Sequence, residues 1–184
     1  MPHTSRRHAL AAPARATIMT YTLTGNMTGS LGSTNFSNTP FTWTQTGDTA
    51  AQLLVGGAHP GIPAITSTIK IGILPLATPT DAFFTAFSDP IDLILCTNNT
   101  ETQFLTFSSP ALNLYDFLAI GPISVSLFST GPIVTDQGTL AINGSTAPPT
   151  NLVFTATEAT IPEPPSLALI ATGLLGLGLR RRRG

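Results

Sequence analysis

The sequence predicts an all-β fold, an antiparallel β-sandwich for which a jelly roll is one arrangement, followed by a short hydrophobic helix at the C-terminus. Three observations lead to this prediction. About nine or ten short segments alternate apolar and polar residues, turn residues separate them at intervals of about 8 to 15 residues, and no long amphipathic helix interrupts them. The chain divides into residues 1–16, a sandwich domain at residues 17–157, and a tail of different composition at residues 158–184.

The first 16 residues look like part of an export leader. Arg6 and Arg7 suit the charged start of a signal peptide, and Ala14-Arg15-Ala16 imitates a small-residue cleavage site. The apolar segment at residues 9–12 is short, however, and Pro13 interrupts it. Either the true start lies upstream and the chain begins inside its signal peptide, or this segment is a degenerate leader. We expect the first.

Two threonine-rich strands are expected at the start of the domain. In residues 19–24 apolar side chains alternate with threonines, and residues 41–46 repeat the pattern around Trp43, which should point inward. Gly25 and the Gly- and Ser-rich residues 29–33 are expected to form turns between the two strands.

The clearest strand pattern lies at residues 65–73. Isoleucines occupy four of its five alternate positions, so they should share one buried face. Residues 56–61 before it are expected to form a loop, and residues 111–118 could form one short helical turn. The other expected strands are residues 51–55, 83–87, 91–96, 102–107, 123–128, 138–142 and 152–157.

Charge is sparse in the body of the chain. Between residues 16 and 161 there is one basic residue, Lys70, against eight acidic residues, which gives this stretch a formal charge of −7. Proteins that bind nucleic acid neutralise phosphates with Lys and Arg, so we exclude nucleic acid as a partner. No intramolecular disulfide can form because there is one cysteine, but 42% hydrophobic residues suffice for a core.

Few residues of the body suit catalysis. His59 is its only histidine, and the glycines and proline around it indicate an exposed loop rather than a Ser-His-Asp site. Cys96 ends an apolar run, which is typical of a buried, inert thiol. Asp89 and Asp92 should diverge at the start of a strand, whereas a glycosidase holds two carboxylates at a fixed separation. We therefore expect no catalytic residues.

No cofactor or metal is expected either. Residues 81–92 lack the Asp-x-Asp-x-Asp-Gly pattern of a calcium loop, and one histidine with one cysteine is too few for zinc. Two alternative functions remain open. The first is a carbohydrate-binding module with Phe36, Phe41 and Tyr115 as surface aromatics, and the second is a secreted hydrolase that uses His59 or an aspartate pair.

The tail has three parts. It begins with Ile161, Pro162, Glu163 and Pro164, where the prolines prevent a helix from running back into the domain. An uncharged run of 14 residues follows, which as a helix would be about 21 Å long against a hydrocarbon core of roughly 30 Å. It comprises Ser166, Leu167, Ala168, Leu169, Ile170, Ala171, Thr172, Gly173, Leu174, Leu175, Gly176, Leu177, Gly178 and Leu179. The cluster that ends the tail, expected to stay on the cytoplasmic side, is Arg180, Arg181, Arg182 and Arg183.

This order of parts resembles the PEP-CTERM sorting signal of bacterial exported proteins, and the match covers about residues 161–183. The resemblance implies recognition by an exosortase, a membrane enzyme that cuts near the Pro-Glu-Pro, with the tail as a transient membrane anchor. It also implies a final place at the cell surface or in the extracellular matrix, in association with exopolysaccharide and biofilm. Because no catalytic set accompanies the tail, we expect a non-enzymatic exported protein.

Overall fold

The computed structural model describes residues 17–55, 59–80, 82–87, 93–97, 104–112, 115–143 and 149–159. These residues form an all-β domain in which each pairing between strands is antiparallel. The predicted all-β antiparallel class is therefore confirmed. The leader at residues 1–16 and the expected C-terminal helix lie outside the described residues.

Each strand expected from the sequence overlaps a strand of the structure. The strands are β1 (Ile18–Leu31), β2 (Thr34–Asp48), β3 (Leu53–Val55), β4 (His59–Ile71), β5 (Phe83–Phe87), β6 (Leu93–Thr97), β7 (Phe104–Ser108), β8 (Ile120–Ser124), β9 (Ser126–Thr130), β10 (Ile133–Thr135), β11 (Gly138–Ile142) and β12 (Thr150–Glu158). Two 3-10 turns accompany them, η1 (Thr49–Ala51) and η2 (Pro110–Leu112). The second overlaps the short helical turn expected at residues 111–118, whereas β10 was not expected.

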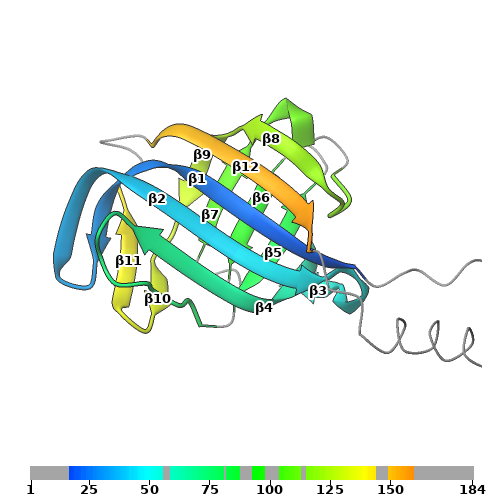
Figure 1. Ribbon diagram of the computed structural model, residues 1–184, viewed down its shortest axis with the longest axis horizontal. Helices are drawn as coiled ribbons and strands as arrows, with labels where there is room; N and C mark the ends of the chain where they lie inside the picture. Colours follow the sequence, from blue (N-terminus) through cyan, green and yellow to red (C-terminus); the bar gives the residue numbers. More distant parts are fainter. Residues whose placement is uncertain are drawn as a thin grey trace, which may run out of the picture.

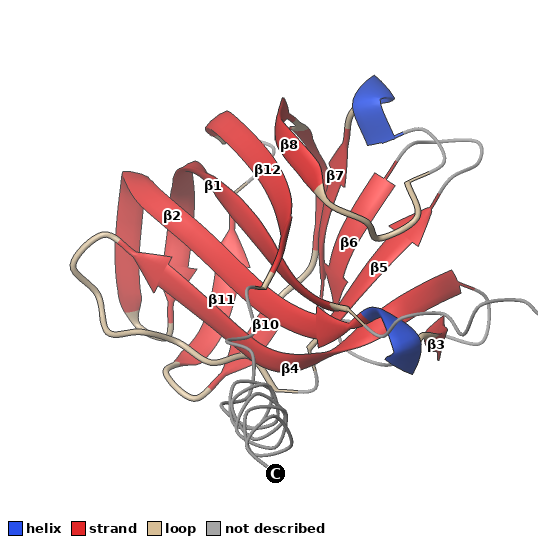
Figure 2. Cartoon of the chain, turned by 45° about the vertical axis from the view of Figure 1, so that its right-hand side comes forward, coloured by secondary structure: helices blue, strands red, loops and turns tan. Residues whose placement is uncertain are grey.

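The strands form one curled sheet. Their order along it is β10-β11-β1-β2-β4-β5-β6-β7-β9, while β12 pairs with β1 and β8, and β3 pairs with β4. Figure 1 shows β12, β1, β2 and β4 crossing in front of β5, β6 and β7, and Figure 2 shows the curl from the side. The fold therefore has two facing layers that are continuous through their shared strands.

The curl is closed by a strand that changes partners. The sequence predicted one strand at residues 123–128, but the structure has β8 and β9 there, separated by Val125. β8 pairs with β12 at one side of the sheet, and β9 pairs with β7 at the other. Val125 is buried at the change and donates its N–H to the carbonyl oxygen of Leu152 at 3.1 Å. The prediction of a single strand is thus wrong, because β8 extends the sheet beside β12 and β9 extends it beside β7.

Both layers supply side chains to one hydrophobic core. Trp43 of β2, Ile69 of β4 and Phe154 of β12 belong to it from one layer, and Leu105 and Phe107 of β7 belong to it from the other. The inward direction predicted for Trp43 is confirmed, since its side chain is buried. Burying a side chain of this size contributes about 1.5–3 kcal/mol, so this core is the main source of stability.

The isoleucine face predicted for residues 65–73 is correct in the middle of the strand and wrong at its ends. Ile69 is 0% exposed, whereas Ile65 is 61% and Ile73 is 99% exposed. The register of β4 against β2 skips Ile65, which makes it the extra residue of a β-bulge and turns its side chain outward. Ile73 follows the end of β4, after Gly72 has turned the chain with a φ of 47°.

The glycines of β1 do not form the turns that the sequence predicted at Gly25 and residues 29–33. β1 runs through them, and only the last two residues of that range turn into β2. The reason is that β12 and β11 share one edge of β1, so their ends approach it closely. A Cβ at Gly25 would lie 2.6 Å from Cδ2 of Leu152, and one at Gly29 would lie 2.1 Å from the carbonyl oxygen of Ala141.

The bulge in β4 can be tested with two matched substitutions. Ile69→Ala should lower the free energy of unfolding by about 2–5 kcal/mol, because it leaves a cavity in the core. Ile65→Ala should change it by less than about 0.5 kcal/mol, because that side chain already lies outside. Urea unfolding followed by the fluorescence of Trp43, the single tryptophan, measures both. Equal losses in the two variants would contradict the bulge.

Candidate functional site

The chain enters and leaves the described domain at the same end of the sheet. β1 and β12 are antiparallel neighbours, so Met19 near the start of β1 lies opposite Glu158 at the end of β12. One residue further on, the N–H of Ala159 donates to the carbonyl oxygen of Ile18 at 2.8 Å. Figure 1 shows both strand ends together at the right of the domain. The tail therefore follows directly from a hydrogen-bonded strand.

The start of β1 is fastened at this same end. Thr17 and Thr49 exchange two hydrogen bonds, from the N–H of Thr49 to the carbonyl oxygen of Thr17 at 3.0 Å and from the N–H of Thr17 to Oγ1 of Thr49 at 3.2 Å. Asp48 caps η1 through a bond of 2.8 Å from the N–H of Ala50 to its Oδ1. The junction between domain and tail is thus an ordered end of the sheet.

The residues predicted to carry the sorting signal lie outside the described residues. These are residues 161–164, the apolar run at residues 166–179 and the arginine cluster at residues 180–183. Within the described part of the chain, no helix has the length and apolar character needed to cross a membrane.

Of the residues considered for catalysis, the structure describes the backbone of His59 and Cys96. His59 begins β4 opposite Val55, so the loop predicted at residues 56–61 is wrong in its second half. Cys96 lies on β6, opposite Phe84 and Leu105, and its side chain is outside the description. Residues 81, 89 and 92 are also outside it. Among the described residues there is no group of three or more His, Cys, Asp or Glu side chains that could hold a metal ion.

The aromatic residues considered as a sugar platform are mostly part of the core. Phe36 is 8% exposed and Phe41 is 1% exposed, so neither can stack on a ligand at the surface. Tyr115 is half-buried and meets the ring of Phe154 edge-on, with 6.0 Å between the ring centroids. Its hydroxyl donates to the carbonyl oxygen of Leu118 at 2.8 Å. The hypothesis that these three aromatics form an exposed platform is therefore wrong.

Two tyrosine hydroxyls have a structural role. The hydroxyl of Tyr21 donates to the carbonyl oxygen of Phe117 at 3.3 Å. Burial raises the pKa of Tyr21, and burial together with the charges on Tyr21 and Asp116 raises the pKa of Tyr115. Both hydroxyls therefore keep their protons throughout the neutral range and serve as hydrogen-bond donors.

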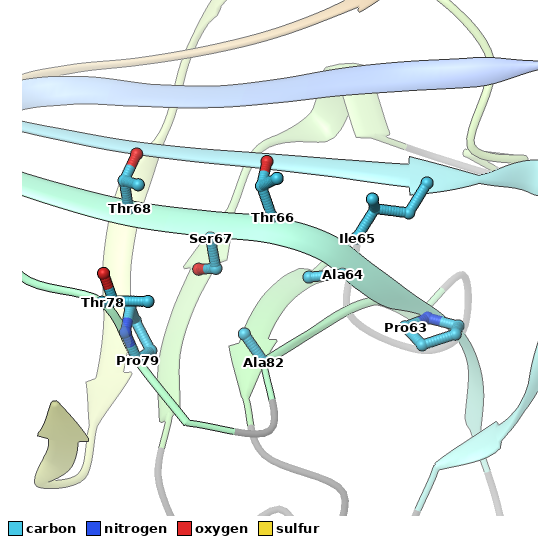
Figure 3. Close-up of a pocket in the computed structure, with 9 residues that line it drawn as sticks. All are labelled: Pro63, Ala64, Ile65, Thr66, Ser67, Thr68, Thr78, Pro79 and Ala82. Atoms are coloured by element: carbon cyan, nitrogen blue, oxygen red, sulfur yellow. The ribbon is translucent and has the colours of Figure 1, made fainter. Parts of the chain in front are cut away.

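A hollow of about 570 Å³ lies beside β4, lined by Pro63–Thr68 and by Thr78, Pro79 and Ala82 (Figure 3). The sequence did not predict this hollow, because it forms where the segment after Ala77 separates from β4. The one available signal was Pro63, which cannot donate a hydrogen bond within a strand and lies close to the bulge.

Comparison with known proteins addresses the tail. The PEP-CTERM protein-sorting motif matches residues 160–183, beginning one residue after the hydrogen-bonded Ala159. The resemblance seen in the sequence is thereby confirmed, and the chain is an exported protein that passes through the membrane and is sorted by an exosortase. Neither a curated protein nor a solved structure matches the chain.

The raised pKa values of the two tyrosines predict how stability depends on alkaline pH. Their folded pKa values lie above the unfolded value of 10.0, so their contribution is complete below pH 10.0 and is lost as pH rises further. We expect the urea midpoint to fall between about pH 10 and 11.5, and to fall less in the Tyr21→Phe, Tyr115→Phe double variant. These are the only two tyrosines of the chain. An equally steep fall in the variant would contradict this role.

Proposed function

We propose that the mature protein is a non-enzymatic β domain of the cell surface or extracellular matrix, released from its membrane-anchored tail by an exosortase and associated with exopolysaccharide and biofilm. The observation that carries this proposal is the PEP-CTERM motif at residues 160–183, which begins where the last strand ends.

The membrane step follows from the three parts of the tail. The uncharged run at residues 166–179 is shorter than a normal membrane span, and local thinning with snorkelling arginines can absorb the difference. Residues 180–183 hold the end of the tail on the cytoplasmic side, so the domain stands on the opposite side. This arrangement supports a temporary anchor that holds the exported domain beside a membrane enzyme.

The junction allows the tail to be cut without disturbing the fold. β12 is paired with β1 up to Glu158, and the last described bond joins Ala159 to Ile18. A cut near Pro162 lies beyond both contacts, so it leaves the described pairing intact. The folded domain therefore suits release as an independent product.

The cut also changes the net charge of the protein. Residues 180–183 supply four of the eight basic residues, and only Lys70 balances the eight acids between residues 16 and 161. Loss of these four arginines takes the formal charge from −1 to −5, and the body between residues 16 and 161 alone carries −7. An acidic body with one histidine and one lysine suits a binding or structural role better than proton-transfer chemistry.

Mass spectrometry of the mature C-terminus in cells with and without the exosortase tests this proposal. With the enzyme, the chain should end near Pro162-Glu163-Pro164, and without it the chain should keep residues 180–183. Glu163→Ala should reduce processing, because it alters the motif, and Glu158→Ala should not, because it alters an acidic residue of β12 outside the motif. An intact arginine cluster in both strains would defeat the proposal.

A further inference from the structure

The hollow beside β4 is a gap between two chain segments that are joined at both of its ends. At one end, Ile69 and Ala77 exchange two backbone hydrogen bonds of 2.7 and 2.9 Å. At the other end, the N–H of Ala64 donates to the carbonyl oxygen of Ala82 at 2.9 Å. Residues 65–68 and the residues opposite them lie between these two connections. The gap is thus framed by backbone hydrogen bonds.

The gap exists because the second segment leaves β4 and binds β10. The N–H of Thr80 donates to the carbonyl oxygen of Val134 at 3.3 Å, and Pro79 forms a bridge with Thr135. Asp136 holds Thr78 through two hydrogen bonds. The N–H of Asp136 donates to the carbonyl oxygen of Thr78 at 3.1 Å, and the N–H of Thr78 donates to Oδ1 of Asp136 at 2.7 Å. These contacts keep the hollow open in the folded protein.

Ser67 presents polar groups to this hollow. Successive residues of an antiparallel strand direct their backbone groups to opposite edges, and Ile69 directs its own toward Ala77. Two residues away, the N–H and C=O of Ser67 therefore face the same edge, where the gap lies. Its side chain points toward the space between β4 and Ala82, opposite in direction to Thr66 and Thr68 (Figure 3).

The Ser67 hydroxyl is set up as a donor. Its oxygen accepts hydrogen bonds from Nε1 of Trp43 at 2.8 Å and from Nε2 of Gln45 at 3.4 Å. A hydroxyl has two acceptor positions and one proton, so with the Gln45 amide in this orientation the proton is left to donate. Ser67 is buried, and a donor held in this way prefers an oxygen of a ligand.

The frame and the lining restrict what can bind. An extended peptide needs an open strand edge, and the bonds at Ala64 and Ile69 close the gap in both directions along β4. None of the nine described lining residues is ionisable, so a buried charge on a ligand would have no counter-charge among them. A volume of about 570 Å³ lies within the range of small-molecule sites, roughly 300–1,000 Å³.

We propose that the hollow between β4 and the opposing residues Thr78, Pro79 and Ala82 binds an uncharged polyol of monosaccharide size. The Ser67 hydroxyl and backbone bind its oxygens and hydroxyls, while Pro63, Pro79 and Ala82 contact its C–H surface. The site differs from the aromatic platform that the sequence suggested. In the extracellular matrix it would contact sugar residues, a consequence that rests on the proposed function, whereas the binding of free sugar does not.

Nuclear magnetic resonance titration of the full-length protein, in a detergent without a sugar headgroup, tests the proposal. Glucose, galactose and N-acetylglucosamine should shift the amide signals of Ser67, Thr78 and Ala82 saturably at millimolar concentration. Glucuronate and glucosamine should bind about tenfold more weakly, because they would bury a charge. Absence of saturable shifts with the three neutral sugars, or equal affinity for the charged pair, would overturn the proposal.

Two matched variants locate the binding. Thr78→Trp should abolish the shifts, because this exposed side chain lines the hollow while its backbone bond to Asp136 remains. Thr80→Trp makes the same change at an exposed residue of the same segment that does not line the hollow, and it should bind sugar normally. Binding retained in Thr78→Trp would refute the site. Mass spectrometry of the tail is unaffected by either result, so failure here is distinguishable from failure of the sorting proposal.

Discussion

The backbone ladder between β1 and β12 joins the first and last strands of the domain, and the rest of the structure depends on it. Its register runs from Met19 opposite Glu158 to Asn26 opposite Thr150. Through it, β12 brings Phe154 into the core and offers its other edge to β8. These contacts join residues far apart in the sequence, so each of them closes a long loop of the chain. The strand that completes the fold is thus the one that precedes the sorting motif.

The closure of the sheet explains both of its irregular features. At Val125 the pairing partner of the chain changes from β12 to β7. β4 takes part in both layers, because its first residues pair with β5 and its later residues pair with β2. A bulge at Ile65 allows this change of direction by adding one residue to β4. The segment after Ala77 then leaves β4 to pair with β10, and the hollow remains between them. The candidate binding site is therefore a product of how the sheet curls.

Local sequence patterns predicted the strands well. The features that these patterns missed depend on contacts between residues far apart in the sequence. The alternation around Trp43 and Ile69 correctly indicated buried faces, because side chains in a strand alternate whatever its partners are. The bulge at Ile65 depends on the register against β2, and the close approach at Gly25 depends on β12, so neither could be read locally. The sorting motif was recognisable because its three parts are contiguous, whereas the parts of the hollow come from two separate segments.

If the β domain is complete before the tail begins, its fold survives removal of the tail. Hydrogen exchange of the backbone amides in residues 19–24 tests this most directly, since these residues pair with the end of β12. We expect the same protection in the full-length protein and in the product released by the exosortase. Loss of protection on processing would show that the tail holds β12 in place and that the domain is not complete without it.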